Sequence, residues 1–382
     1  MTTCRIAVIG HIRNPIATPF RGGMEAHCWH LVHGLRERGH DVTLFASGDS
    51  TIDVPLVPVV ARHCDADFPW HAYHGTAALT AHQDAAFAAV LPRLAEGGFD
   101  VVHNNSLHRF PPRLARAARL PTVTSFHVPP FDPLSRVAGD AVAPWSRFTV
   151  CSTRQRAVWW PEGAPPEAHV VPNGIDPALW PYRATGDGSA VWAGRITATK
   201  APHLAAQAAR IAGVPLRIYG VIEDRDYFER ALAPELGGRI GYEGHLQGDA
   251  LAEAIGAASV LLFTPHWDEP FGLAAVEAMA CGVPVAATDM GAVAEVVGEA
   301  GCLAPADDAA GLAEALRRAM AIPRRVPRAR VEARFTRDRM IDAYEALYDR
   351  AIAARDRPAT PPRYSATALP WDGERVCATA VA

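Results

Sequence analysis

Short apolar runs alternate with stretches of helical periodicity along most of this 382-residue chain, and this alternation limits the fold more than any other feature. The runs are rich in β-branched residues, as at residues 6–9, and the stretches between them repeat their apolar positions at helical spacing. Strands that alternate with helices form parallel sheets covered by helices on both faces. The chain is therefore predicted to be an α/β protein built from doubly wound, Rossmann-like parallel sheets.

The alternation occurs as two series separated by a segment without periodicity. In the first series we expect strands at 4–10, 41–46, 100–104, 121–127, 147–152 and 169–176, and helices at 22–38, 77–96 and 107–119, the last capped by Ser106. In the second series we expect strands at 190–193, 215–219, 241–245, 259–265 and 284–288, and helices at 200–212, 224–236, 251–257, 273–280, 292–297, 309–321 and 337–354.

The two series are predicted to be two domains, because the length and an apolar fraction of 49% suffice for two hydrophobic cores. Residues 1–178 form the first domain and residues 189–336 the second. The segment 179–188 is rich in Pro and Gly, which indicates a linker. We expect helix 337–356 to cross back to the first domain, and the proline-containing tail 357–382 to be disordered.

Composition excludes several classes of protein. A net charge of -4 gives no general attraction to nucleic acid. Membrane association is left open but not indicated, since no apolar run approaches the roughly 20 residues of a membrane helix and no signal segment opens the chain. The seven cysteines form no Cys-x-x-Cys pair, which favours reduced thiols in a cytoplasmic protein and gives no sign of a metal site.

The stretch from Glu269 to Glu277 has the features of an anion-binding site that also contains two carboxylate side chains. It follows an apolar run and opens a helix at Pro270, whose missing N–H suits a first helical turn. Free N–H groups and the helix dipole at such a start favour a phosphate. The two carboxylates suggest a ligand that also carries hydroxyl groups, and a sugar nucleotide satisfies both conditions. The alternative is an ordinary loop with a helix-stabilising glutamate.

Two further loops carry groups that suit phosphates. Gly22 and Gly23 stand between a strand and a helix and form either a phosphate-binding loop or a tight turn. The full Gly-x-Gly-x-x-Gly fingerprint is absent, so a nicotinamide cofactor is not expected. Arg195 and Lys200 occupy another strand-to-helix loop, where they either bind a diphosphate or form part of a solvated surface.

Taken together and in order, these motifs resemble the family-four retaining glycosyltransferases of the GT-B fold, over residues 4 to about 355. The motifs that carry the resemblance are Gly22-Gly23-x-Glu25, Thr124-x-Phe126-His127, Val171-Pro-Asn-Gly-Ile-Asp176, Ala193-Gly-Arg195 with Lys200, and Glu269-Pro-Phe-Gly-Leu followed by Glu277-Ala-Met-Ala-Cys-Gly-Val-Pro284. The last block is the most specific of them.

The resemblance implies a hexosyltransferase that moves a sugar from a nucleotide-diphosphate sugar, with a UDP-hexose expected, to a small-molecule, glycan or lipid-linked acceptor. It implies retention of the anomeric configuration, with no metal and no other cofactor. The domain at 1–178 would bind the acceptor and the domain at 189–336 the nucleotide sugar, the two facing each other across a cleft.

The resemblance also implies roles for individual residues. His127, Arg195, Lys200 and Glu269 would be the catalytic residues. Glu277 would bind the ribose of the donor, and Arg195 and Lys200 would bind its diphosphate. The transferred sugar would be held by Glu269 and by the amides of Phe271, Gly272 and Leu273. Gly22 and Gly23 would contact the donor from the other domain. For His127 the alternative is a structural histidine at a strand end.

Some positions depart from the family pattern. Ala201-Pro202 follows Lys200 where a glycine is frequent, and Val128 follows His127 where an acidic residue is frequent. The loops 11–21, 62–75 and 103–110 carry histidines and Trp70, which either line an acceptor groove or lie on the surface. Two other functions are compatible with the fold, a nucleotide-sugar hydrolase or epimerase and a non-catalytic partner subunit.

Overall fold

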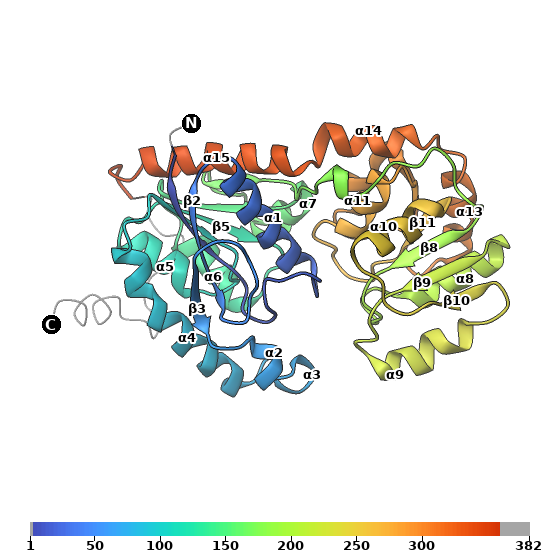
Figure 1. Ribbon diagram of the computed structural model, residues 1–382, viewed down its shortest axis with the longest axis horizontal. Coiled ribbons are helices and arrows are strands. Elements are labelled where there is room, and N and C mark those ends of the chain that lie inside the picture. Colours follow the sequence, from blue (N-terminus) through green and yellow to red (C-terminus); the bar gives the residue numbers. More distant parts are fainter. Residues whose placement is uncertain (1–2, 360–382) are drawn as a thin grey trace. The chain divides into compact units, whose positions relative to one another are not determined.

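The computed structural model describes residues 3–359, which form two compact units. The first unit comprises residues 3–151, 156–171 and 340–359, and the second comprises residues 152–155 and 172–339. Each unit contains one parallel β-sheet (Figure 1). The assignment of the units to acceptor and donor remains a prediction.

The first unit is built on a sheet of seven parallel strands in the order β3-β2-β1-β4-β5-β6-β7. The strands are β1 (Arg5–Ile9), β2 (Asp41–Ser47), β3 (Leu56–Val60), β4 (Val101–Asn104), β5 (Thr122–Phe126), β6 (Ser146–Val150) and β7 (Ala168–Val170). Ile6 of β1 pairs with Val42 of β2 on one side and with Val101 of β4 on the other. The strand order therefore reverses at β1, which creates a topological switch point between β1 and β4.

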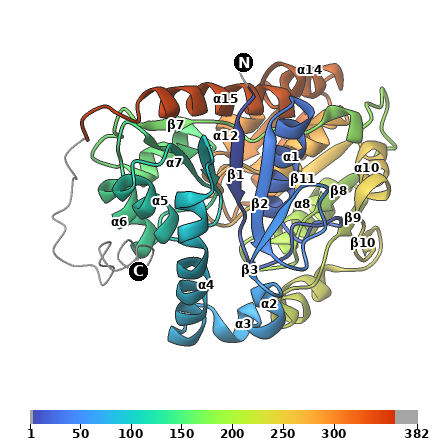
Figure 2. The same ribbon diagram turned by 60° about the vertical axis from the view of Figure 1, so that its left-hand side comes forward.

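Alternate side chains of β1 enter two different cores of the first unit. Ile6 and Val8 pack in one cluster with side chains of α1 (Gly23–Glu37) and α15 (Arg337–Ala353), and Ala7 and Ile9 pack in another with α4 (Ala77–Glu96) and α5 (Phe110–Ala117). This alternation is the period of two that an extended strand requires. Helices therefore cover both faces of the sheet (Figure 2). The remaining helices are α2 (Cys64–Asp67), α3 (Trp70–Tyr73), α6 (Asp132–Asp140) and α7 (Thr153–Trp159).

The second unit repeats the plan with six parallel strands in the order β10-β9-β8-β11-β12-β13. The strands are β8 (Ala190–Ala193), β9 (Leu216–Tyr219), β10 (Ile240–Tyr242), β11 (Val260–Phe263), β12 (Val285–Thr288) and β13 (Gly301–Ala304). The helices are α8 (Pro202–Ala212), α9 (Arg225–Tyr227), α10 (Gly248–Ala257), α11 (Leu273–Ala280), α12 (Val293–Val297), α13 (Ala309–Ala319) and α14 (Arg325–Arg334). Here the order reverses at β8, so the switch point lies between β8 and β11.

The prediction of two doubly wound parallel sheets is confirmed, but several elements were not predicted. They include β3, β13, α6 and α14. Strand β3 contains Pro58, and it occupies the edge of the first sheet, where a missing N–H donor is tolerated. Helix α14 has six polar or proline positions in its Arg-Val-Pro-Arg-Ala-Arg-Val-Glu-Ala-Arg sequence and no apolar period for sequence analysis to detect.

Two predicted helices differ from the structure in their local geometry. Helix α5 begins at Phe110 and not at Leu107, because Leu107 has a left-handed φ of 57° and the Ser106 hydroxyl accepts a hydrogen bond from the amide of His108. The predicted cap at Ser106 is therefore wrong. The helix predicted at 224–236 is instead the single turn α9, followed by a π-helical and then a 3-10 segment.

The end of the chain lies partly outside the described residues. The tail predicted to be disordered comprises residues 357–382. All of it except residues 357–359 lies outside the described residues. Among residues 3–359, none of the helices combines the length and the apolar character that a membrane span needs.

Helix α15 contributes buried side chains to the core of the first unit, including Ile341, Tyr344 and Tyr348. It also brings a buried carboxylate to that core. Glu345 is 3% exposed, and its two oxygens lie 2.9 Å from Nε2 of His40 and 2.5 Å from Nη1 of Arg38. The same Arg38 nitrogen lies 2.5 Å from Asp342, whose side chain is 62% exposed. One arginine thus pairs with one buried and one exposed carboxylate of the same helix.

We predict that the buried carboxylate stabilises the first unit far more than the exposed one. Glu345→Ala should lower the free energy of unfolding by about 3 kcal/mol, because it leaves His40 and Arg38 beside an unfilled buried site. Asp342→Ala, the matched control on the same helix, should cost under about 1 kcal/mol. Scanning calorimetry of both variants measures the difference, and equal losses would contradict the prediction.

Candidate active site

The loops that follow β8, β11 and β12 meet at the carboxyl edge of the second sheet. Strands β8 and β11 are hydrogen-bonded neighbours through the pairs Ala190–Val260 and Val191–Leu261. Because the strand order reverses here, the connections after these two strands leave toward opposite faces of the sheet. Ligands of open α/β sheets bind in this position. The predicted residues Arg195, Lys200 and Glu269 all lie on these loops.

Lys200 and Glu269 form an ion pair that joins the loops after β8 and β11. The Lys200 Nζ lies 2.6 Å from Glu269 Oε2, and Glu269 is only 6% exposed. Nε1 of Trp267 donates a second hydrogen bond to the same oxygen at 2.7 Å. The Lys200 ammonium also lies 5.1 Å from the centre of the Trp267 ring, within cation–π range. These three side chains form what we call the Lys200–Trp267–Glu269 cluster.

A buried hydroxyl fixes the backbone that carries Lys200. Thr264 Oγ1 lies 2.9 Å from the carbonyl oxygen of Lys200 and 3.0 Å from that of Ala201, and it accepts a hydrogen bond from Nε1 of Trp192 at 2.9 Å. In addition, the amide of His266 donates to the carbonyl of Thr199 at 2.8 Å. The two loops are therefore bonded along their backbones as well as through the ion pair.

The backbone of Glu269 is held by the loop that follows β12. The Ala292 amide donates to the Glu269 carbonyl at 2.8 Å. Gly291 stands beside it with a φ of +63°, and a Cβ there would lie 2.3 Å from both the nitrogen and the carbonyl oxygen of Glu269. Only glycine fits this approach without strain. The position of the Glu269 carboxylate thus depends on three separate loops.

Helix α11 begins at Leu273 and presents its first amides at the same edge; the prediction that Pro270 opens this helix is wrong, because the left-handed Gly272 is its N-terminal cap. Gly272 caps it with a φ of +94°, and a Cβ at that position would lie 2.9 Å from the ring of Phe263. The Phe271 side chain is 3% exposed and packs against Phe335, with ring centroids 5.5 Å apart. What residues 271–273 can offer a ligand is therefore their backbone N–H groups, which at a helix start have no intrahelical acceptor.

Glu277 lies one turn into α11 and is only partly exposed. Burial raises the pKa of its carboxyl group from 4.5 to about 7. A group that titrates near neutral pH at the edge of a ligand site is a functional candidate. The side chain of Arg195 is exposed, and its Nη1 donates to Glu223 Oε2 at 2.6 Å, so it does not contact Glu269 directly.

Gly22 and Gly23 stand at the start of α1 in the first unit, but they do not form a tight turn. Gly22 is the N-terminal cap with an extended φ of -165°, and Gly23 is the first helical residue. The buried carboxylate of Glu25 lies beside them, since a Cβ on Gly22 would be 2.8 Å from its Oε2. The other Glu25 oxygen accepts from Nδ2 of Asn14 at 3.2 Å. The helix start is thus already faced by one negative charge, and its phosphate-binding role stays a prediction.

His127 follows β5 at the carboxyl edge of the first sheet. Its Nε2 lies 3.0 Å from Oδ1 of Asn105, the residue that follows β4 by one position, and its ring centroid is 4.2 Å from that of His27. Burial lowers the pKa of His127 to about 4, and burial with neighbouring histidines lowers the pKa of His27 well below its usual value. His127 is therefore a neutral imidazole near pH 7, with Nδ1 making no hydrogen bond to the described residues.

Two of the histidines considered for an acceptor groove belong to the protein interior. His103 is fully buried, with Nδ1 2.5 Å from the Tyr348 hydroxyl and Nε2 2.9 Å from that of Ser125. His108 is 7% exposed and bonds to Asp84 at 3.0 Å. For these two residues the structural interpretation is the better one.

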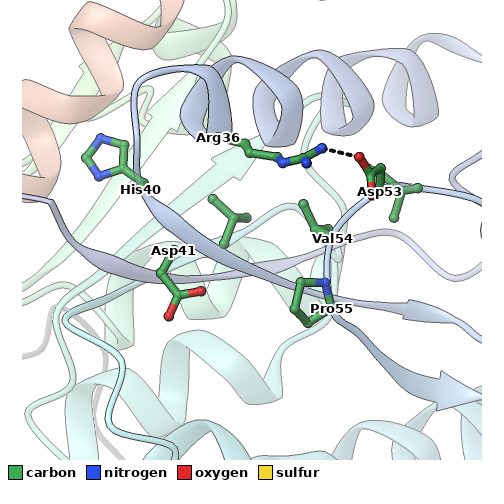
Figure 3. A pocket seen from close by; sticks show the side chains of 8 residues that line it. Arg36, His40, Asp41, Asp53, Val54 and Pro55 are labelled. Atoms are coloured by element: carbon green, nitrogen blue, oxygen red, sulfur yellow. Dashed lines mark hydrogen bonds and ion pairs between the residues drawn. The ribbon is translucent and has the colours of Figure 1, made fainter.

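A cavity of about 440 Å³ opens elsewhere in the first unit, beside the end of α1 and the start of β2 (Figure 3). It is lined by Arg36, His40, Asp41 and Asp53, and an Arg36–Asp53 ion pair of 2.5 Å lies along its wall. Asp41 is the first residue of β2, so the cavity lies at the amino edge of the sheet, opposite to the edge where ligands of such sheets bind. We do not assign it to the active site.

Four residues that contact the predicted site residues were not predicted: Trp267, Thr264 and Glu223 in the second unit, and Asn105 in the first. A tryptophan two residues before Glu269 was the only one with a visible signal, since large aromatics in polar loops often contact ligands. The others act through contacts between distant segments. No group of three or more His, Cys, Asp or Glu side chains within residues 3–359 is arranged to hold a metal ion.

Two family models match the chain, one in each half. "Glycosyltransferase Family 4" matches residues 21–179, and "Glycosyl transferases group 1" matches residues 183–335. Together they include every predicted site residue.

Proteins of known activity are similar over most of the chain. The phosphatidyl-myo-inositol mannosyltransferase of Mycolicibacterium smegmatis is 30% identical, over 79% of this chain and 82% of its own. The D-inositol 3-phosphate glycosyltransferase of Mycolicibacterium vanbaalenii is 30% identical, over 91% and 90%.

Solved structures show the same fold at lower identity. The sucrose-phosphate synthase of Thermosynechococcus elongatus has a TM-score of 0.73 at 21% identity, covering 92% of this chain and 100% of its own. HepE of Anabaena, in complex with UDP and glucose, has a TM-score of 0.68 at 17% identity, covering 91% and 99%. The matches in both halves, together with the two parallel-sheet units, show that the chain belongs to the family-four glycosyltransferases and has the GT-B fold.

Proposed function

We propose that this glycosyltransferase moves a hexose from a nucleotide-diphosphate sugar, with UDP-hexose as the first candidate, to a hydroxyl of an acceptor, and that it retains the anomeric configuration. The observation that carries the proposal is the Lys200–Trp267–Glu269 cluster at the start of α11, with Glu277 one turn further on. It combines a cation and free amides for the diphosphate with two carboxylates for hydroxyl groups.

The cationic groups keep hydrogen-bond donors available for a diphosphate. An ammonium has three N–H donors and a guanidinium has five, whereas the contacts described above use one donor of Lys200 and one of Arg195. The amides of Phe271, Gly272 and Leu273 add donors and the positive end of the helix dipole. In the proposal these remaining donors bind the phosphates of the nucleotide sugar.

The carboxylates supply the acceptors that sugar hydroxyls need. Glu277 would accept hydrogen bonds from both ribose hydroxyls in a bidentate arrangement, and Glu269 from the hydroxyls of the transferred sugar. The pKa of Glu277 near 7 is also relevant, because hydrogen bonds from two hydroxyl donors favour the ionised form of a carboxyl that is partly protonated at neutral pH.

The proposed chemistry follows from where charge develops. Breaking the bond between the anomeric carbon and its oxygen places negative charge on the departing diphosphate, and Lys200, Arg195 and the start of α11 stabilise that charge most in the transition state. The acceptor hydroxyl attacks from the same face and passes its proton to the departing phosphate. Neither a metal ion nor a covalent intermediate on Glu269 is part of this proposal. His127 would act as a neutral hydrogen-bonding group.

The proposed acceptor is a polyol hydroxyl, and the proposed location is the cytoplasm. The two named relatives act on phosphatidyl-myo-inositol and D-inositol 3-phosphate, which supports an acceptor with a polyol hydroxyl, in a small molecule, a glycan or a lipid-linked form. The complex of HepE with UDP and glucose supports a uridine nucleotide. The six cysteines among the described residues form no disulfide bond, which suits the reducing cytoplasm.

Incubating the protein with nucleotide sugar alone separates transfer from hydrolysis or epimerisation. The proposal requires slow turnover until an acceptor is added, whereas rapid turnover of the donor alone would favour a hydrolase or epimerase. A non-catalytic partner subunit would have no need of Lys200, Arg195, Glu269 and Glu277, all of which are present.

We predict that donor binding and turnover can be separated by mutation. Lys200→Ala and Glu277→Ala should each weaken binding of the nucleotide sugar by about 10- to 100-fold, the value of a hydrogen bond to a charged group. His127→Ala, the contrasting variant, should keep donor affinity and lose turnover by about 100-fold. Calorimetric titration of the donor that gives the largest thermal shift among uridine, guanosine, adenosine and thymidine nucleotide sugars measures this. Unchanged affinity in both donor-site variants would exclude the assigned site.

We also predict that donor affinity depends on pH through Glu277. Because the ionised carboxylate is the better acceptor for ribose hydroxyls, affinity should fall as the pH drops below about 7, by up to about tenfold per unit. Stability changes with pH in the opposite direction. As the pH rises from 4.5 to about 7, ionisation of the buried Glu277 carboxyl lowers the free energy of unfolding of the ligand-free protein. Glu277→Gln should bind weakly and without this pH dependence. A dependence that persists in Glu277→Gln would assign it to another group.

A further inference from the structure

The indole of Trp267 touches both charged groups of the Lys200–Trp267–Glu269 cluster. Its N–H donates to Oε2 of Glu269 at 2.7 Å, and its ring lies 5.1 Å from the ammonium of Lys200. The family resemblance assigns functions to Lys200 and Glu269 but none to this residue. Trp267 is only partly exposed, and it stands on the loop between β11 and α11, two residues before Glu269.

Both hydrogen bonds to the Glu269 side chain end on the same oxygen. Lys200 Nζ and Trp267 Nε1 lie 2.6 Å and 2.7 Å from Oε2. Oε1 accepts no hydrogen bond from the described residues, and it is not among their fully enclosed unpaired atoms. A carboxylate that is 6% exposed overall thus keeps one oxygen occupied by protein and the other available to a ligand.

The two donors to Oε2 differ in how firmly they are held. Lys200 carries its charge on a flexible four-carbon stem and would turn toward a diphosphate when one binds. The indole N–H sits on a rigid ring with two rotatable bonds. If Lys200 were the only donor, movement of its ammonium would release the carboxylate, and a buried charge without a partner is unfavourable. Trp267 supplies the donor that stays in place.

We infer that Trp267 is a positioning residue that holds Oε2 of Glu269 and so directs Oε1 to the hydroxyls of the transferred sugar. The inference rests on the proposed function, because it assigns the sugar to Glu269. It predicts that Trp267 contributes to recognition of the sugar and not of the nucleoside diphosphate. A general structural role would instead weaken the affinity for both the sugar and the nucleoside diphosphate.

The test uses Trp267→Phe, which removes the N–H donor and keeps an aromatic face beside Lys200. The probes are UDP, UDP-glucose, GDP and GDP-mannose, titrated by calorimetry, with initial rates measured on the sugar nucleotide that binds more tightly. Affinity for the nucleoside diphosphate should be unchanged. The increment in affinity due to the sugar should disappear, and kcat/KM should fall about 10- to 100-fold, as expected for a lost hydrogen bond to a charged group.

Trp160→Phe is the matched control, since its indole Nε1 donates at 3.2 Å to the carbonyl of Ala138 within a core of the first unit. It should leave both affinities unchanged. Trp267→Phe would overturn the inference if it behaved like the wild type, or if it weakened the nucleoside diphosphate and the sugar nucleotide by the same factor. Failure of the wild-type protein to bind any of the four probes would instead overturn the proposed function, and this assignment with it.

Discussion

The ion pair between Lys200 and Glu269 is the interaction on which the proposed donor site depends. It joins the loops that leave β8 and β11 on the two sides of the switch point, at 2.6 Å and with little exposure to solvent. Removing one partner would leave the other charge buried and unpaired, which is costly. The surrounding contacts hold both partners in place, through Thr264 at the Lys200 backbone and through Ala292 at the Glu269 backbone. A diphosphate would therefore meet donors that are already oriented, which reduces the reorganisation needed during the reaction.

The far end of α11 is also electrostatically matched to the proposed ligand. Arg328 of α14 donates to the carbonyl of Ala280 at 2.8 Å, and Arg324 donates to that of Cys281 at 3.3 Å. These groups satisfy carbonyls that end a helix without partners and place positive charge at the negative end of its dipole. An anion at one end of α11 and arginines at the other complete the compensation of the helix dipole. This gives α14, which shows no apolar period, a physical reason to be helical and to stay packed.

Much of the fold could be predicted from local sequence patterns, and the elements that the prediction missed were missed for physical reasons. The bounds of β8 and α11 agree with the prediction, since each is a short apolar or helix-forming run that ends at a glycine or proline. Strand β3 was missed because Pro58 argues against a strand unless the strand lies at a sheet edge, which no local pattern reveals. Lys200 and Glu269 could be identified because they belong to motifs. The contribution of Thr264 could not, since it arises only where segments 63 and 64 residues apart in sequence come together.

Hydrogen exchange with and without nucleoside diphosphate tests the central claim most directly, because it reports on backbone amides one segment at a time. If the start of α11 and the loop after β8 bind the diphosphate, then UDP or GDP should slow exchange at residues 271–276 and 194–200, and Lys200→Ala should remove this protection. If a bound nucleoside diphosphate protects other segments and leaves these two unchanged, the donor site lies elsewhere in the chain.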